Sequence, residues 1–461
     1  MVTISGSVQS GSTRHSAGHP GSGTPALLTD HYELTMLQAA LRSGAARRRS
    51  VFEVFSRRLP DGRRYGVVGG TGRVIEAIEA FRFDEAQLAY LARTGVVDRA
   101  TVDWLADYRF RGTVRGYPEG ECYFPQSPIL TVEGSFAEAV VLETVILSIL
   151  NHDSAIAAAA SRMTSAAAGR PCIEMGSRRT HEHAAVAAAR AAYLAGFAST
   201  SNLEAGYRYG IPTQGTAAHA FTLVHDSERE AFQTQVDTLG KGTTLLVDTY
   251  DVAEAVRVAV DVAGADLGAV RLDSGDLLWM AHRVRRQLDE LGARGTKIVV
   301  TSDLDEYAIA ALAIAPVDAY GVGTQLVTGS GAPTASMVYK LVARAGSDDP
   351  EAPMVPVEKR APDKPSRGGR KQAFRRLDPD GVAIEEVVVP EQAGAPATDH
   401  TRTPDEHRRD LLVPFMEHGE PVARPALYEG RDLLRRSLAE LPLSATQLSR
   451  GEPVIPTVYG I

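Results

Sequence analysis

The chain has 461 residues, of which 44% are hydrophobic, and its formal net charge is -8. This length is enough for two or three domains and at least one large core. The negative charge argues against nucleic acid or an anionic membrane as the main partner, because both require a clustered positive surface. The sequence has no run of about 18 apolar residues, so no membrane span is predicted.

The N-terminal segment and the cysteines indicate where the protein works. Residues 1–24 are rich in Gly, Ser, Thr and His and lack the apolar core of a signal peptide, so we predict a disordered tail. Cys122 and Cys172 cannot form a disulfide framework, and they match no metal-ligand spacing. We therefore expect a protein of the reducing cytoplasm.

Residues 25–168 are predicted to form an N-terminal α/β domain with a connecting helix. Apolar residues recur at helical spacing over residues 27–41, where Thr29 or Asp30 suits the N-cap. Short strands and proline-rich turns follow, and a long helical pattern at about residues 137–168 leads into a more regular region.

Residues 169–344 alternate short apolar strands with helical patterns. The intervals between strands are about 20–30 residues, which is the size of a strand-helix unit in a parallel α/β barrel. We therefore predict an irregular parallel α/β barrel, with an open doubly wound sheet as the alternative. The predicted strands cover residues 172–174, 198–201, 213–219, 244–248, 270–273, 298–302 and 319–323.

Nearly every predicted strand ends in a polar or charged residue. Loops from all strands of a barrel converge at the carboxyl ends, so these residues are expected to surround one mouth. This pattern is the strongest physical indication of an active site in the sequence. The residues are Glu174, Ser201, His219, Asp248, Asp273, Asp303 and Gly323.

His219 follows small residues that leave room for a ligand beside the imidazole. A lone buried histidine is usually a hydrogen-bonded core residue, but the carboxylates predicted nearby favour a function. Asp248 or Glu174 would hold one ring nitrogen protonated and leave the other as a nucleophile. The segment from Arg271 to Asp276 places an arginine and two acids at a glycine turn, which favours binding of an anion, magnesium or ribose hydroxyls over an internal salt bridge.

Three other patterns are weaker. Gly321-Val322-Gly323-Thr324 could present backbone N–H groups to a phosphate, but no Gly-Lys-Ser/Thr follows, so it is not a P-loop. His181-Glu182-His183 lacks a third ligand at a useful spacing, which argues against zinc.

Residues 345–461 are predicted to be a loop-rich C-terminal region. Its basic residues suit a solvated loop or, less simply, a mobile lid over phosphates: Lys359, Arg360, Lys364, Arg367, Arg370, Lys371, Arg375 and Arg376.

Five segments in order resemble the nicotinate phosphoribosyltransferase family, over residues from Leu27 to about Arg376. They are Leu28-Thr29-Asp30-His31-Tyr32, Glu174-Met175-Gly176-Ser177-Arg178-Arg179, Gly215-Thr216-Ala217-Ala218-His219, Arg271-Leu272-Asp273-Ser274-Gly275-Asp276 and Tyr320-Gly321-Val322-Gly323-Thr324. The resemblance implies an irregular α/β barrel and a homodimer with shared active sites. It also implies ATP-coupled, magnesium-dependent synthesis of nicotinate mononucleotide from nicotinate and phosphoribosyl pyrophosphate.

The resemblance also implies roles for particular residues. His219 matches the histidine that becomes phosphorylated, and Tyr32 matches an aromatic residue that stacks on the pyridine ring from the partner subunit. Asp248 and Asp273 fall near the ribose and the metal. The nicotinate contacts correspond to Arg178, Thr216 and Arg271, and the 5'-phosphate contacts to Gly321, Gly323 and Thr324.

Ser201 is the residue expected to separate users of the acid from users of the amide, because a carboxylate at this position would repel nicotinate. The serine predicts a preference for nicotinate over nicotinamide. The basic loop departs from the family, which often has a Pro-Gly turn before lysine where this chain has Ser366-Arg367-Gly368-Gly369-Arg370-Lys371. Nicotinamide or quinolinate transfer, or a non-catalytic metabolite-binding regulator, are the alternatives.

Overall fold

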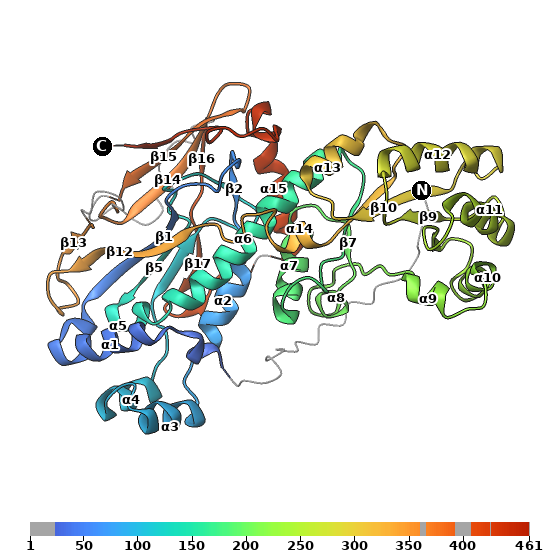
Figure 1. The fold of residues 1–461 in the computed structure, drawn as a ribbon. Coiled ribbons are helices and arrows are strands. Elements are labelled where there is room, and N and C mark those ends of the chain that lie inside the picture. Colours follow the sequence, from blue (N-terminus) through green and yellow to red (C-terminus); the bar gives the residue numbers. More distant parts are fainter. Residues whose placement is uncertain (1–23, 360–365, 392–406, 425, 461) are drawn as a thin grey trace.

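The computed structural model describes residues 24–359, 366–391, 407–424 and 426–460. They form two lobes that share one long helix, α6 (Glu143–Ala166), which runs between them (Figure 1). Val145, Ile146 and Leu150 of α6 lie in the core of the first lobe. Ile156 and Met163 of the same helix lie in the core of the second. The predicted tail lies outside the described residues except for Thr24. Within the described ranges, no helix is long and apolar enough to cross a membrane.

The first lobe is built on an antiparallel sheet to which both ends of the chain contribute. Strand β1 lies at the middle of the sheet and pairs with β5 and β12, which are far apart in the sequence. In order across the sheet, the strands are β13 (Met354–Pro356), β12 (Met337–Ala345), β1 (Arg49–Ser56), β5 (Leu130–Ser135), β3 (Thr113–Gly116), β17 (Val413–Glu417) and β18 (Glu420–Pro421). The predicted boundary at residue 344 falls inside β12.

Helices cover one side of this sheet, and the first of them begins as predicted. The Asp30 side chain accepts a hydrogen bond from the His31 backbone N–H at 2.8 Å, which caps α1. Leu34 and Leu37 are buried on its inner face, and Gly44 ends it in the left-handed conformation. The helices are α1 (His31–Ser43), α2 (Thr71–Ala80), α3 (Glu85–Thr94), α4 (Arg99–Ala106) and α5 (Phe136–Val140).

The second lobe contains a parallel sheet that curls as half of a barrel, which confirms the predicted α/β class (Figure 1). Its strand order is β7 (Ser199–Thr200), β6 (Cys172–Glu174), β11 (Ala319–Val322), β10 (Lys297–Ser302), β9 (Ala269–Leu272) and β8 (Thr244–Leu246). The strand predicted at residues 213–219 is wrong. This segment makes one isolated bridge, between Thr200 and Thr213, and forms no ladder with any strand of the sheet.

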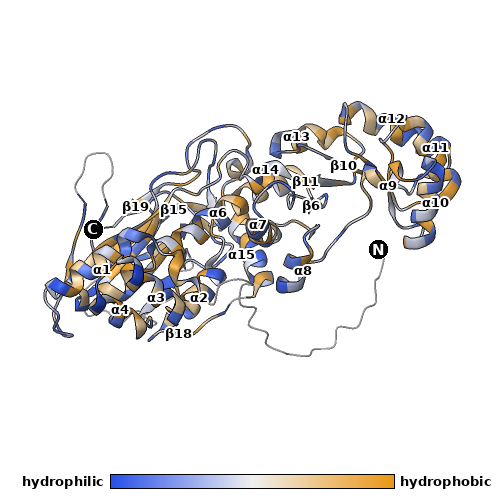
Figure 2. Cartoon of the chain, turned by 60° about the horizontal axis from the view of Figure 1, so that its bottom comes forward, coloured by the Kyte–Doolittle hydropathy of each residue, from blue (hydrophilic) through white to orange (hydrophobic). Residues whose placement is uncertain are grey.

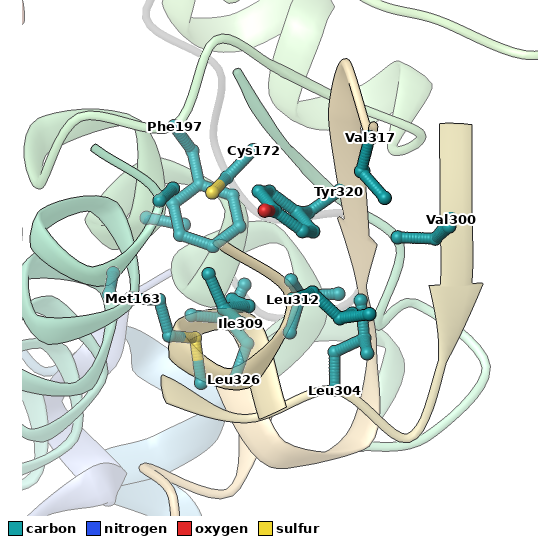
Figure 3. Close-up of a cluster of buried hydrophobic side chains, with 14 of the residues drawn as sticks. Met163, Cys172, Phe197, Val300, Leu304, Ile309, Leu312, Val317, Tyr320 and Leu326 are labelled. Carbon is teal, nitrogen blue, oxygen red and sulfur yellow. The ribbon is translucent and has the colours of Figure 1, made fainter. Parts of the chain in front are cut away.

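Alternation of side chains divides this sheet into a packed face and an open face. On β9, Val270 and Leu272 are buried against helices, whereas Ala269 and Arg271 line a cavity on the other face. Figure 3 shows the packed face, where Tyr320 and Val300 meet a cluster of aliphatic side chains. The helices of this lobe are α7 (Glu182–Leu194), α8 (Leu203–Tyr209), α9 (His219–Leu223), α10 (Glu228–Leu239), α11 (Val252–Ala263), α12 (Leu277–Glu290), α13 (Glu306–Ala311) and α14 (Thr324–Val327). Helices α10–α12 carry both hydrophilic and hydrophobic residues, as expected for helices that cover a sheet on one side (Figure 2).

The C-terminal region contains more regular structure than its composition predicts. A further sheet has the order β16 (Arg408–Asp410), β14 (Lys371–Leu377), β15 (Ala383–Pro390) and β19 (Thr457–Tyr459), and it is accompanied by α15 (Leu427–Ala439). The predicted loop-rich segment therefore includes a four-stranded sheet. The difference arises because charged side chains in β14 and β15 pair across the ladder, which hides the alternation of apolar residues.

The basic residues of this region are largely ion-paired within the fold. The Arg375 side chain is fully buried and pairs with Glu121 at 2.8 Å and Glu386 at 3.0 Å. Lys371 is also buried and pairs with Glu53 at 2.9 Å. The described basic residues therefore divide between a loop, where Lys359 and Arg367 are exposed, and strand β14, where Lys371 and Arg375 are buried. A role as a lid over phosphates stays a prediction. Arg360 and Lys364 lie outside the described residues.

Replacing Arg375 by Met will lower the free energy of unfolding by about 3 kcal/mol or more, because Glu386 loses its buried cationic partner. Arg376→Met is the matched control. Arg376 is the next residue and pairs with Glu385 at 2.8 Å, but its side chain is 53% exposed, so we expect a loss below about 1 kcal/mol. Thermal and urea unfolding of both variants measure the difference, and equal losses would contradict a specific role for the buried ion pair.

Candidate active site

The open face of the parallel sheet lines a cavity of about 1120 Å³. The cavity extends along the strands from their amino ends, at Pro171 and Gly268, to their carboxyl ends, at Ser302 and Gly323. Small or polar residues at inward positions leave this space, which a closed barrel would fill with large aliphatic side chains. Most of the predicted site residues line it: Arg178, Ser201, Thr216, Arg271, Asp273, Asp303, Gly321, Gly323 and Thr324.

His219 begins helix α9 and does not end a strand as the sequence predicted. Its side chain is 39% exposed, and its Nε2 lies 3.8 Å from Asp273 Oδ2 and 3.9 Å from Asp248 Oδ1. Its Nδ1 lies 3.1 Å from the Thr249 hydroxyl. The expectation that Glu174 holds the ring is wrong, because Thr249 is the residue that contacts Nδ1.

Glu174 is fully buried, away from the predicted mouth. Its carboxylate accepts hydrogen bonds from the Gly176 backbone N–H and the Thr200 hydroxyl. Its chain neighbours Ile173 and Met175 line the cavity, so the Glu174 side chain points to the opposite face of β6. The two acids that do reach the imidazole are Asp248 and Asp273.

Asp248 and Asp273 are joined through the loop that follows β9. One oxygen of Asp248, Oδ2, accepts hydrogen bonds from the Asp273 backbone N–H and the Ser274 hydroxyl, both at 2.8 Å. The Asp248 side chain is only 3% exposed, and its Oδ1 is buried without a hydrogen-bond partner in the described part of the chain. Asp273 accepts a hydrogen bond from the Thr301 hydroxyl on β10. The pair therefore presents one orphaned oxygen and one partly exposed carboxylate beside the imidazole.

Three arginines line the cavity, Arg178, Arg179 and Arg271, and two of them interact with each other. Burial lowers the pKa of Arg271, Asp273 and Asp248 act in the opposite direction, and the positive charge of Arg178 lowers it further. Arg178 is thus close enough for the two charges to interact. The Arg271 Nε has no hydrogen-bond partner among the described residues. Two neighbouring arginines with an unused donor make this wall suited to an anionic ligand.

The remaining predicted contacts lie at the ends of β7 and β11. The Ser201 backbone N–H donates to the Glu174 carbonyl at 2.8 Å, which fixes Ser201 at the rim. A Cβ at Gly321 would lie 2.4 Å from the Thr301 methyl carbon, so the approach of β10 to β11 requires glycine here. Gly323 precedes the short helix α14, which begins at Thr324.

Tyr32 does not line the cavity of its own chain. It lies on α1 in the first lobe, at the opposite end of the molecule from α9–α12 in both views (Figures 1 and 2). Its side chain is 44% exposed. Burial, together with the neighbouring Glu143 carboxylate, raises the pKa of Tyr32 to about 12. A role for Tyr32 in the cavity therefore requires a second subunit, and that role stays a prediction.

Sequence reasoning missed two hydroxyl groups, those of Thr249 and Thr301. Thr249 directly follows Asp248, so its place after a strand end was a usable signal. Thr301 lies within β10 and resembles any β-branched strand residue, so only its pairing with Asp273 reveals it.

The comparisons with known proteins agree with this geometry. Residues 27–151 match the family model described as nicotinate phosphoribosyltransferase N-terminal domain. The nicotinate phosphoribosyltransferase pncB1 of Mycobacterium tuberculosis is 57% identical over 96% of this chain and 97% of its own. The Bacillus subtilis nicotinate phosphoribosyltransferase is 37% identical over 76% of this chain and 73% of its own. The crystal structure of human nicotinic acid phosphoribosyltransferase superposes with a TM-score of 0.78 at 27% identity, over 94% of this chain and 97% of that one. The chain therefore belongs to the nicotinate phosphoribosyltransferase family.

Proposed function

We propose that this chain transfers the phosphoribosyl group of phosphoribosyl pyrophosphate to nicotinate, with coupled hydrolysis of ATP. The C1–O bond to pyrophosphate breaks, and the lone pair of the pyridine nitrogen forms the new C1–N bond. The products are nicotinate mononucleotide, pyrophosphate, ADP and phosphate. The observation that carries the proposal is a cavity lined by Arg178, Arg271 and Asp273. His219 and Asp248 lie beside it, because His219 Nε2 is 3.8 Å from Asp273 and 3.9 Å from Asp248.

The cavity residues divide between the two substrates. Arg178 and Arg271 suit the nicotinate carboxylate, which a guanidinium grips in a bidentate manner, and Ser201 and Thr216 add hydroxyl donors beside it. Gly321, Gly323 and Thr324 suit the 5'-phosphate, because glycines let backbone N–H groups approach it closely. Holding both substrates in one orientation converts a bimolecular encounter into an oriented reaction, which is a large part of the rate that the protein supplies.

The two aspartates fit magnesium. Mg²⁺ usually binds one or two carboxylates and completes its shell with phosphate oxygens and water, and the orphaned Oδ1 of Asp248 is such a ligand. The described residues contain no cluster of three or more His, Cys, Asp or Glu side chains arranged for a metal, so substrate oxygens would complete the site. When bound, the ion neutralises the departing pyrophosphate.

ATP coupling is assigned to His219. If Nδ1 donates its proton to the Thr249 hydroxyl, Nε2 keeps a free lone pair to attack the γ-phosphorus of ATP, with ADP as the leaving group. Water then hydrolyses the phosphohistidine. While present, the phosphate adds negative charge next to Asp248 and Asp273, which favours magnesium and ordered substrate loops.

Product analysis tests the reaction class. The protein is incubated with phosphoribosyl pyrophosphate and nicotinate, nicotinamide or quinolinate, each with and without ATP. We expect nicotinate mononucleotide as the main product and more of it with ATP. Transfer to nicotinamide or quinolinate would favour the alternative enzymes, and binding without turnover would favour a metabolite-binding regulator.

The partners in this proposal are the small-molecule substrates. The net charge of -8 argues against nucleic acid as a further partner.

A homodimer with shared sites is part of the proposal, and Tyr32 tests it. Mixed subunits carrying Tyr32→Ala and His219→Ala should regain activity, because one site of each heterodimer combines an intact Tyr32 with an intact His219. The measurement is activity of a tagged heterodimer against each variant homodimer. Activity no higher than that of the homodimers would place both residues in one subunit's site. His225→Ala mixed with Tyr32→Ala controls for the mixing itself.

A further inference from the structure

Glu174 is a buried carboxylate that lies outside the cavity and is held by uncharged donors. One oxygen accepts from the Gly176 backbone N–H, and the other from the Thr200 hydroxyl. Burial raises the pKa of Glu174, and the two hydrogen bonds oppose that shift. A buried carboxylate without a cation costs stability, so its presence next to the cavity calls for a role.

Thr200 extends this contact into the loop after β7. Its hydroxyl oxygen accepts a hydrogen bond from the Asn202 backbone N–H at 2.9 Å, which leaves its proton for Glu174. The Asn202 side chain then donates to the Ser177 hydroxyl at 3.0 Å, on the loop after β6. The backbone of Ser201 is thereby fixed on both sides.

Thr200 also holds the segment between α8 and α9. Its backbone N–H donates to the Pro212 carbonyl at 3.0 Å, and its carbonyl accepts from the Gln214 N–H at 2.9 Å. Thr216 lies two residues further along. Three separate loops, which carry Arg178, Ser201 and Thr216, therefore meet at Glu174 and Thr200.

We infer that Glu174 and Thr200 are positioning residues that set the spacing of Arg178, Ser201 and Thr216, and so determine how tightly nicotinate binds. This inference rests on the proposed function. Gly176 reinforces the arrangement, because a Cβ at this position would lie 2.2 Å from a Val327 methyl group and 3.2 Å from the Gly323 carbonyl. This close packing requires glycine at position 176, so the loop that carries Arg178 passes directly beside the Glu174 carboxylate.

Thr200→Val tests the inference, because valine keeps the shape and removes the hydroxyl. We expect the KM and the calorimetric Kd for nicotinate to rise about tenfold, which corresponds to about 1.4 kcal/mol. The KM for phosphoribosyl pyrophosphate at saturating nicotinate should change less than about twofold. Thr200→Ser restores the hydroxyl and should return the nicotinate Kd to near the wild-type value.

Ser199→Ala is the matched control. The Ser199 hydroxyl is buried one residue earlier and has no hydrogen-bond partner in the described ranges, so its loss should leave the nicotinate Kd unchanged. If Thr200→Val does not fold, Glu174→Gln serves instead. The N–H₂ of the glutamine amide must face one of the two donors, so this variant should also raise the Kd for nicotinate.

The outcomes separate the inference from the proposed function. If the wild type uses nicotinate and Thr200→Val retains its nicotinate Kd, the positioning role is wrong and the proposed function stands. Equal losses for both substrates that follow the drop in Tm, without rescue by serine, would also overturn it. If the wild type neither binds nor uses nicotinate, both fail together.

Discussion

Replacing Ser201 by Asp will lower the ratio of kcat/KM for nicotinate over nicotinamide by about a hundredfold or more. Ser201 lines the same cavity as Arg178 and Arg271, so a carboxylate here would face the nicotinate carboxylate with like charge. Each tenfold loss corresponds to about 1.4 kcal/mol of transition-state binding, and a like-charge juxtaposition can cost several kcal/mol. Nicotinamide is neutral and carries an N–H donor, so its use should fall less or even rise.

Ser201→Asn is the matched control for this prediction, because it has nearly the shape of aspartate without the charge. It should move the ratio much less than Ser201→Asp does. Steady-state kinetics with both substrates, at saturating phosphoribosyl pyrophosphate, provide the measurement. A ratio that stays constant in Ser201→Asp would show that residue 201 does not contact the carboxylate, and Arg178 or Arg271 would then discriminate alone.

His219→Ala will abolish stimulation by ATP and leave a slower transfer that does not depend on ATP. The expectation follows from the proposed function, in which His219 accepts the phosphate; its Nε2 lies beside Asp248 and Asp273, and its Nδ1 contacts Thr249. The wild type incubated with γ-labelled ATP should carry an acid-labile phosphate on the peptide that contains His219. The variant should carry none.

His225→Ala controls for the loss of a histidine in the same segment. His225 Nδ1 lies 2.7 Å from the Phe221 carbonyl oxygen, so its ring contacts the backbone of its own segment. This variant should keep both the label and the ATP stimulation. Label on another residue, or full ATP stimulation without any label, would defeat the assignment to His219.

The sequence predicts most of the half barrel because its strands are short apolar runs with polar ends. Val270 to Asp273 illustrates this: two buried aliphatic residues alternate with Arg271, and an acid follows. The segment 213–219 was wrongly predicted as a strand because it continues the same spacing. Gly215 and the paired alanines before His219 have low strand propensity, and a single bridge at Thr213 is all that forms.

The C-terminal strands could not be predicted because their stabilising partners are distant in sequence. Arg375 in β14 looks like a surface residue until Glu121 is placed beside it. The site shows the same limit. Asp248, Asp273 and Arg271 are predictable from strand ends, whereas the contact of Thr301 with Asp273 and the burial of Glu174 depend on how the strands are packed.

The sheet of the first lobe has a consequence for synthesis on the ribosome. Strand β1 lies between β5 and β12, and β12 follows β1 by roughly 280 residues, which takes about 14–56 s at 5–20 residues per second. The half barrel lies wholly between β5 and β12 in the sequence. The lobe that starts the chain therefore cannot complete its sheet until the later lobe has left the ribosome. During that time the nascent chain exposes the unpaired edge of β1, which can pair with another chain and aggregate. Chaperones protect the chain most usefully in this period.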